Sequence, residues 1–149
     1  MDTDKQFHRI LAATDGSQAA DRAVSFAGGL AAACGAALVV LTVDDEVASR
    51  ELQMFGRIEH VATGELLETQ HQAILARARA LAVEAGVKDV TTMSETGDPA
   101  TNILDAAKKT GASLIVTGRR GCGQLEGLLL GSVSQKLASL APCPMLIVP

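Results

Sequence analysis

Short apolar runs alternate along the chain with segments in which apolar residues recur every three or four positions. The runs lie at residues 8–13, 36–43, 87–95, 113–117 and 145–148. Runs of this kind predict β-strands, and the uninterrupted run 36–43 is typical of a strand covered on both faces, as in a parallel sheet. The periodic segments between the runs predict helices.

The expected helices are bounded by residues that suit helix ends. Ser17 and Asp98 are favourable N-caps, Asp98 is followed by a proline at the first helical position, and Gly35, Gly86 and Gly111 suit helix C-termini. We therefore expect one helix between Ser17 and Gly35, one over 65–85, one between Asp98 and Gly111, and one that opens at Ser132. The residues expected to face the core are Ala20, Ala23, Val24, Ala27, Ala31, Leu67, Ile74, Ala78, Leu81, Ala85, Ile103, Leu104, Ala107, Val133, Leu137 and Leu140.

Five strands alternating with helices predict a single α/β domain over residues 1–149, built as an open sheet with helices on both faces. The stretch 44–63 follows no clear period, and we expect a long loop with one short helix there. No internal repeat or low-complexity linker divides the chain.

Composition narrows the classes of partner. The chain has 13 Lys and Arg against 17 Asp and Glu, a net charge of −4, and only 2% aromatic residues. An acidic chain with few aromatic residues is a poor candidate for binding nucleic acid, which needs a basic surface or stacking rings. Neither a signal peptide nor an apolar stretch long enough to span a membrane is visible. Three scattered cysteines without a CxxC pair favour a reducing, cytoplasmic location.

Candidate ligand-binding residues lie where two predicted strands end. The first strand ends at Thr14-Asp15-Gly16 and the fourth at Gly118, where a glycine-rich loop leads to Gly131-Ser132 at the start of the last helix. Open α/β sheets bind ligands beyond the carboxyl ends of their strands, and the N–H groups at a helix N-terminus favour phosphate. The alternative is an ordinary loop that ends in a serine cap, and the pattern alone leaves both open.

The common nucleotide fingerprints are absent. No GxxxxGK[ST] motif occurs, so the chain has no P-loop lysine. Gly121, Gly123 and Gly127 form GxGxxxG, one residue longer than the dinucleotide fingerprint, and the first strand–helix turn carries Asp-Gly-Ser instead of glycines. These departures count against an NAD site.

A different motif fits better. Gly118, two residues, Gly121, nine residues and Gly131-Ser132 resemble the G-2x-G-9x-G(S/T) motif of the universal stress protein family. The segments ILAATDGSQAADRAVSFAGGLAA, GDPATNILDAA, GASLIVTGRRG and LLLGSVSQKLASLAPCPMLIV also resemble that family, so the likeness covers nearly the whole chain except residues 44–64.

The resemblance implies a Rossmann-like fold of the adenine nucleotide alpha hydrolase type, with sheet order 3-2-1-4-5, and a site for ATP. Asp15, flanked by Ala13 and Thr14, would contact adenine or ribose, and Val43 would meet the adenine. The remaining residues would surround the ribose and phosphates; they are Thr117, Gly118, Arg120, Gly121, Gly131, Ser132, Val133 and Ser134. The resemblance also implies a homodimer paired through the fifth strand, residues 145–148.

Three functions remain open on the sequence: a nucleotide-binding stress or signalling module, an ATPase or nucleotidyl-transfer enzyme, and a nucleotide-free dimeric adaptor. We expect the first, because no general base or metal-binding carboxylate pair stands out, and neither catalytic nor metal-ligating residues are assigned. ATP is the expected nucleotide; AMP, ADP or a cyclic form are the alternatives, and Mg²⁺ could accompany the phosphates. We expect structural or solvated roles for Cys34, Cys122, Cys143, His8, His60 and His71.

Overall fold

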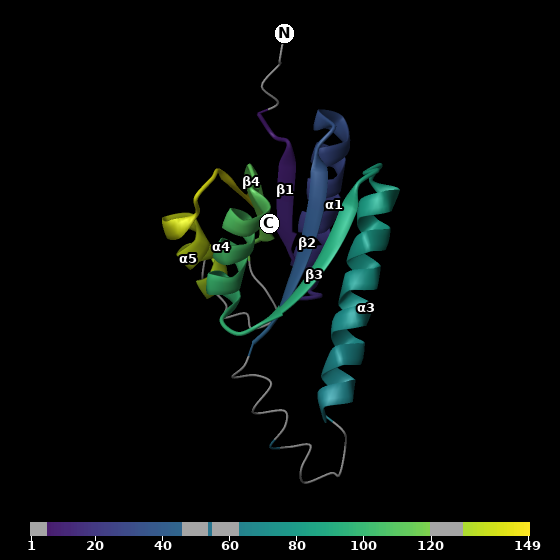
Figure 1. Cartoon of the computed structure of the whole chain (residues 1–149), viewed down its shortest axis with the longest axis vertical. Coiled ribbons are helices and arrows are strands. Elements are labelled where there is room, and N and C mark those ends of the chain that lie inside the picture. Colours follow the sequence, from purple (N-terminus) through teal and green to yellow (C-terminus); the bar gives the residue numbers. More distant parts are fainter. Residues whose placement is uncertain (1–5, 46–53, 55–62, 120–129) are drawn as a thin grey trace.

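A twisted sheet of five parallel strands forms the centre of the computed structural model, which describes residues 6–45, 54, 63–119 and 130–149 (Figure 1). The strand order is β3-β2-β1-β4-β5, so the predicted order 3-2-1-4-5 is confirmed. The strands are β1 (Arg9–Ala13), β2 (Ala37–Asp44), β3 (Val90–Thr96), β4 (Leu114–Gly118) and β5 (Met145–Val148). Because the chain moves outward from β1 first through β2 and then through β4, the strand order reverses between β1 and β4.

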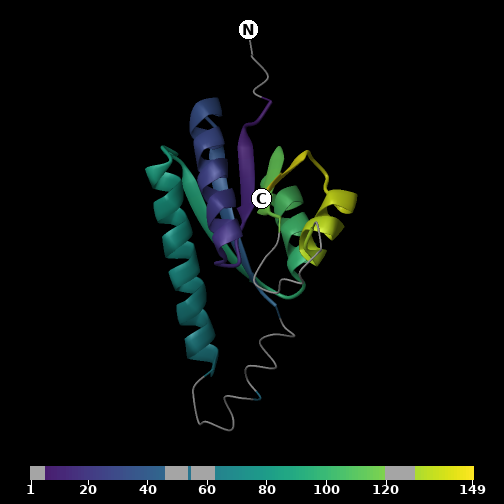
Figure 2. The same ribbon diagram turned by 180° about the vertical axis from the view of Figure 1, so that it is seen from behind.

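Helices cover both faces of the sheet, as predicted. The helices are α1 (Gln18–Cys34), α3 (Thr63–Glu84), α4 (Pro99–Thr110) and α5 (Ser132–Leu140). Helices α1 and α3 lie on one face, and α4 and α5 lie on the other, which is seen by comparing Figures 1 and 2. Among the described residues, no helix combines the length and apolarity needed to cross a bilayer.

The predicted caps are present. The Ser17 hydroxyl accepts a hydrogen bond from the Ala20 N–H (3.2 Å), and the Asp98 carboxylate accepts one from the Thr101 N–H (2.9 Å). Gly35 and Gly111 end α1 and α4 in the left-handed conformation, where a residue with a Cβ is strained. Local sequence therefore determines these helix ends.

Two apolar clusters, one on each face, form the core. Ile10, Leu38 and Val40 are fully buried beneath α1 and α3, whereas Leu11 and Ile115 are fully buried on the side of α4 and α5. Successive strand residues point to opposite faces, and both faces are covered, which explains why β1, β2 and β4 read as continuous apolar runs.

Two expected core assignments were wrong in part. Leu140 is 57% exposed, because α5 ends there and Leu137 fills the space beneath it. On α3 the most buried residues are Leu75, Ala78 and Ala82, with Ile74 and Leu81 only partly buried beside them. The face of α3 against the sheet is therefore rotated from the expected one, because small alanines allow close packing against α1.

The third strand begins at Val90 instead of residue 87. Val87 is buried, and its N–H donates to the Ala82 carbonyl (3.3 Å), so it finishes the turn after α3. Gly86 in that turn has φ +105°. The apolar character of Val87 is thus explained by the helix end and not by a strand.

Candidate functional site

The carboxyl ends of β1, β2 and β4 meet at one edge of the sheet. Ala13 pairs with Leu41 of β2, and Ala12 pairs with Val116 of β4. Extended by two or three residues, these registers set Asp15 level with Val43 on one side and with Arg119 on the other. Residues that are far apart in sequence therefore lie at one edge of the sheet, where the strand order reverses and ligands bind in open α/β sheets.

The turn between β1 and α1 is held by its own side chains. The Thr14 hydroxyl accepts from the Gly16 N–H (3.2 Å), and the Asp15 Oδ1 accepts from the Ser17 N–H (2.9 Å). Thr14 is buried, whereas Asp15 is exposed. Gly16 has φ +81°, which a residue with a Cβ rarely adopts. The turn thus fixes the backbone of Asp15 at the carboxyl end of β1.

Backbone hydrogen bonds of Arg119 connect the end of β4 to the start of α5. The Arg119 N–H donates to the Val148 carbonyl of β5 (2.7 Å), and the Gly131 N–H donates to the Arg119 carbonyl (2.8 Å). The buried Ser134 hydroxyl donates to the Gly118 carbonyl (2.9 Å) and lies 3.5 Å from the Thr117 hydroxyl. The two ends of the glycine motif are therefore held together.

The first turn of α5 offers N–H groups without a side-chain cap. Gly131 is the N-cap residue, and no side-chain hydrogen bond caps the helix. The N–H groups at the start of a helix have no carbonyl partner within the helix, and the helix dipole adds partial positive charge there. The backbone of Ser132 and Val133 is therefore suited to an anion.

The structure requires glycine at one of the two described motif glycines. A Cβ at Gly118 would lie 3.0 Å from the Ala19 carbonyl carbon and 3.2 Å from its Cβ, so glycine permits α1 to pack against the end of β4. Gly131, the N-cap of α5, has φ −70°, which any residue adopts, so its backbone conformation does not require glycine.

The predicted site residues thus fall into three groups. Ala13, Thr14, Asp15, Val43, Thr117 and Gly118 end the central strands, and Gly131, Ser132, Val133 and Ser134 begin α5. The third group, Arg120 and Gly121, lies outside the described residues, as does Cys122. The expected loop and short helix at 44–63 also lie outside them, except for residues 44, 45, 54 and 63.

Sequence reasoning missed two contacts at this edge of the sheet. The backbone of Arg119 links β5 to α5, as described above. Helix α3 also reaches this edge: the His71 Nε2 lies 4.0 Å from the Asp44 Oδ1, and Ile74 packs against Gly16, where it would lie 3.0 Å from an added Cβ. No sequence signal marks these contacts, because they depend on how far α3 extends past the sheet.

Asp98, which follows β3 at the same edge of the sheet, is the N-cap of helix α4. Hydrogen bonds from the Thr101 hydroxyl and N–H, followed by the nearby Lys136 ammonium, hold the pKa of Asp98 below its ordinary value. Lys136 comes from α5, with its Nζ 3.5 Å from the carboxylate. This contact links the start of α4 to the middle of α5.

Comparison with known proteins identifies the family to which the chain belongs. The family model described as the universal stress protein family matches residues 6–149. This chain belongs to the universal stress protein family. A universal stress protein of Bacillus subtilis, YxiE, is 37% identical over 147 residues, covering 95% of this chain and 99% of the relative.

Solved universal stress proteins have the same fold. A universal stress protein in complex with cAMP is 30% identical, with a TM-score of 0.72 over 95% of this chain and 96% of that one. One from Archaeoglobus fulgidus in complex with dAMP is 19% identical, with a TM-score of 0.69 over 96% and 98%, and this likeness concerns the fold alone. The expected family and fold are thus confirmed.

Proposed function

We propose that this universal stress protein binds an adenine nucleotide, ATP, at the carboxyl ends of β1 and β4. The observation that carries the proposal is the pair of Arg119 backbone hydrogen bonds, which hold Gly118 and the uncapped start of α5 together at the sheet edge where β1 ends next to β4. A relative that is 30% identical binds cAMP, which supports an adenine nucleotide as the class of ligand.

The geometry suggests how such a ligand would lie. The phosphates would accept hydrogen bonds from the N–H groups and the Ser132 hydroxyl at the start of α5. The ribose and adenine would then extend toward Asp15 and Val43 along the strand ends. Ser134 would act differently from the expectation: its hydroxyl is buried and donates to the Gly118 carbonyl, so it would support the phosphate site indirectly.

We further propose that binding, without dedicated turnover, is the main role of the site. Backbone N–H groups and hydroxyls hold phosphates but do not activate water as a general base does. Steady-state phosphate release from ATP, with and without Mg²⁺, tests this point. Release that rises in proportion to protein, and falls in a Ser132→Ala variant, would instead assign an ATPase.

Calorimetric titration with ATP, ADP, AMP and cAMP tests the binding proposal. Ser132→Ala removes a hydroxyl from the phosphate end, and Ser139→Ala makes the same change in the last turn of α5, where the hydroxyl donates to the Gln135 carbonyl. A hydrogen bond to a charged group contributes about 1.5–3 kcal/mol, so Ser132→Ala is expected to weaken ATP binding about 10–100-fold. Ser139→Ala is expected to leave the affinity unchanged.

Asp15→Asn tests the other end of the nucleotide. Asparagine can still accept the hydrogen bond from the Ser17 N–H, so the turn is preserved while one acceptor oxygen is lost. We expect adenosine and ATP to bind about fivefold more weakly, from the loss of about 1 kcal/mol. Equal affinity of wild type, Ser132→Ala and Asp15→Asn for every nucleotide would place the ligand elsewhere or show that none binds.

We also propose that the chain forms a homodimer through β5. The Val148 and Pro144 carbonyls accept hydrogen bonds from β4, so the alternate residues Met145 and Ile147 point their backbone groups to the other side. Ile147→Pro therefore removes a donor from the open edge without removing one that faces β4. We expect a dimer for the wild type and a monomer for Ile147→Pro in sedimentation equilibrium; a wild-type mass near 15.4 kDa would refute the dimer.

A further inference from the structure

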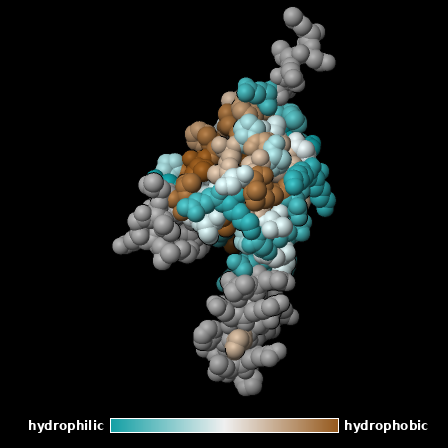
Figure 3. Space-filling view, turned by 90° about the vertical axis from the view of Figure 1, so that its left-hand side faces the viewer, coloured by the Kyte–Doolittle hydropathy of each residue, from teal (hydrophilic) through white to brown (hydrophobic). Residues whose placement is uncertain are grey.

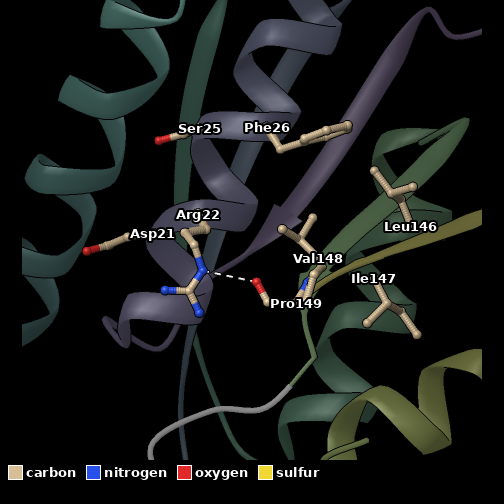
Figure 4. A pocket seen from close by; sticks show the side chains of 8 residues that line it. All are labelled: Asp21, Arg22, Ser25, Phe26, Leu146, Ile147, Val148 and Pro149. Carbon is tan, nitrogen blue, oxygen red and sulfur yellow. Dashed lines mark hydrogen bonds between the residues drawn. The ribbon is translucent and has the colours of Figure 1, made fainter. Parts of the chain in front are cut away.

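Helix α3 extends past the strand ends at the carboxyl edge of the sheet and is held there on both sides of Ile74 (Figure 1). One turn before Ile74, the His71 Nε2 lies 4.0 Å from the Asp44 Oδ1 at the end of β2. One turn after it, the Arg77 Nε–H donates to the Asp21 carboxylate in the first turn of α1 (2.8 Å), and Figure 4 shows the Asp21 side chain pointing toward α3. Because residues three positions apart are neighbours on a helix surface, these two contacts hold Ile74 against the turn between β1 and α1.

The Ile74 side chain lies directly against Gly16 in that turn. A Cβ added to Gly16 would lie 3.0 Å from the Ile74 Cγ1 and 3.2 Å from its Cδ1. Gly16 also has φ +81°, a conformation that a residue with a Cβ rarely adopts. Two separate features therefore require glycine here, and one of them is the close approach of an isoleucine from another helix.

The turn carries Asp15, which we have proposed for the adenosine end of the nucleotide. The Thr14 N–H donates to the Leu41 carbonyl of β2 (2.9 Å), which fixes the start of the turn, and helix α1 fixes its end. Between these points the Gly16 N–H donates to the Thr14 hydroxyl (3.2 Å), a bond that shapes the turn without attaching it to the rest of the protein. Ile74 provides a contact from outside the turn.

Ile74 approaches the turn from the sheet face opposite to α5. Helix α5, whose start we have proposed for the phosphates, lies on the side of the molecule that faces the viewer in Figure 3, whereas α3 lies with α1 on the other face. Ile74 therefore supports the turn from behind. A residue in this place influences where the Asp15 carboxylate lies without touching a nucleotide at the strand ends.

We propose that Ile74 is a positioning residue for the adenosine end of the nucleotide site. It holds the backbone of Gly16, and through it the Asp15 carboxylate, in place beside the nucleoside. This inference rests on the nucleotide binding proposed above and adds to it a residue outside the glycine motif on which affinity depends. A binding group that is already held in place loses less conformational freedom on binding, so loss of the support lowers affinity although no contact with the ligand is removed.

Ile74→Ala is the decisive variant, and Leu81→Ala is its matched control. Both residues are partly buried aliphatic residues of α3, but Leu81 lies two turns further on, about 10 Å along the helix, and packs against the core beneath α1 and α3. Ile74→Val is the conservative variant, because it retains Cγ1, the atom nearest to Gly16. Thermal unfolding monitored by circular dichroism checks that all three variants are folded at the temperature of the titrations.

Calorimetric titration with adenosine and with ATP measures the effect on the site. We expect Ile74→Ala to weaken the binding of both ligands by the same factor, about fivefold, because the phosphate end is unchanged, and we expect Ile74→Val and Leu81→Ala to bind like wild type. Since Ile74 acts through Asp15, the double variant Ile74→Ala/Asp15→Asn is expected to bind as weakly as Asp15→Asn alone. Independent roles would instead multiply the two losses.

Hydrogen exchange reads the turn without any ligand. The Gly16 and Ser17 amides donate to side chains within the turn, so we expect both to exchange faster in Ile74→Ala than in wild type or Leu81→Ala. Unchanged exchange, unchanged nucleotide affinity of Ile74→Ala, an equal loss in Leu81→Ala, or losses that multiply with Asp15→Asn would each overturn the inference and leave the proposed function in place. A wild-type protein that binds neither adenosine nor ATP would refute the proposed function, and this inference with it.

Discussion

Two adjacent glycines on α1 provide a test of how closely α1 and α3 pack. Gly28 is buried against α3: an added Cβ would lie 2.9 Å from the Ala85 Cβ and 3.2 Å from the Ala82 Cα. Gly29 is exposed, and among the described residues nothing beyond its own stretch of helix lies within 4 Å of an added Cβ. The substitution to alanine is chemically identical at both positions, so their difference isolates the packing contact.

The two variants are expected to shift stability in opposite directions. Alanine is favoured over glycine in a helix interior by about 0.5–1 kcal/mol, so Gly29→Ala raises the free energy of unfolding by that amount. At Gly28 the same gain is opposed by overpacking, which costs about 2–3 kcal/mol because the neighbouring atoms are backbone or the first side-chain atom and cannot rotate away. We expect Gly28→Ala to lower the free energy of unfolding by about 1–2 kcal/mol.

Urea denaturation followed by circular dichroism measures both values. The difference between the variants is expected to be about 2–3 kcal/mol, which corresponds to roughly 4–12 °C in melting temperature for a chain of this size. Equal stabilisation by the two substitutions would show that α3 moves away from α1 at no cost, and would refute the close contact.

Two further predictions concern the ends of α4 and α5. Asp98→Ala is expected to lower the free energy of unfolding by about 1 kcal/mol at neutral pH through loss of the cap. Because the pKa of Asp98 is lowered from its ordinary value of 3.8 in the folded chain, this contribution is present above that pH and is lost as the pH falls through the folded value, so a difference between variant and wild type that does not shrink on acidification would contradict it. Ser134→Ala removes the buried hydroxyl that donates to the Gly118 carbonyl and is expected to cost about 1 kcal/mol in urea denaturation, with Ser139→Ala as the neutral comparison.

The fold was predictable because its signals are local. Ser17, Gly35, Asp98 and Gly111 mark helix ends by hydrogen bonds and backbone conformations that depend on a few neighbouring residues. The apolar runs of the central strands follow from burial on both faces. The sheet order, by contrast, could be predicted only from the family resemblance, because the residues of a strand do not indicate which strands lie beside it.

The site was predictable only as far as the motif extends. The spacing from Gly118 to Gly131 indicates a loop that returns to a helix N-terminus, but not that the backbone of Arg119 joins the two ends. The contact of Ser134 with Gly118 could not be predicted from the sequence either, because a serine in the first turn of a helix can face a ligand or the protein. The rotated face of α3 could not be predicted for a similar reason: it depends on the close contact of Ala82 and Ala85 with Gly28 of α1, which lie far apart in sequence.

Arg119 has a consequence for how this edge of the molecule opens. Its N–H belongs to the β4–β5 ladder through Val148, and its carbonyl receives the N–H of Gly131 at the entrance to α5. Displacing Arg119 breaks both hydrogen bonds, so we expect the sheet edge and the start of α5 to open together when this residue moves. Hydrogen exchange at the Arg119 and Gly131 amides is then expected to report similar free energies of local unfolding, although one amide belongs to the sheet and the other to the start of a helix.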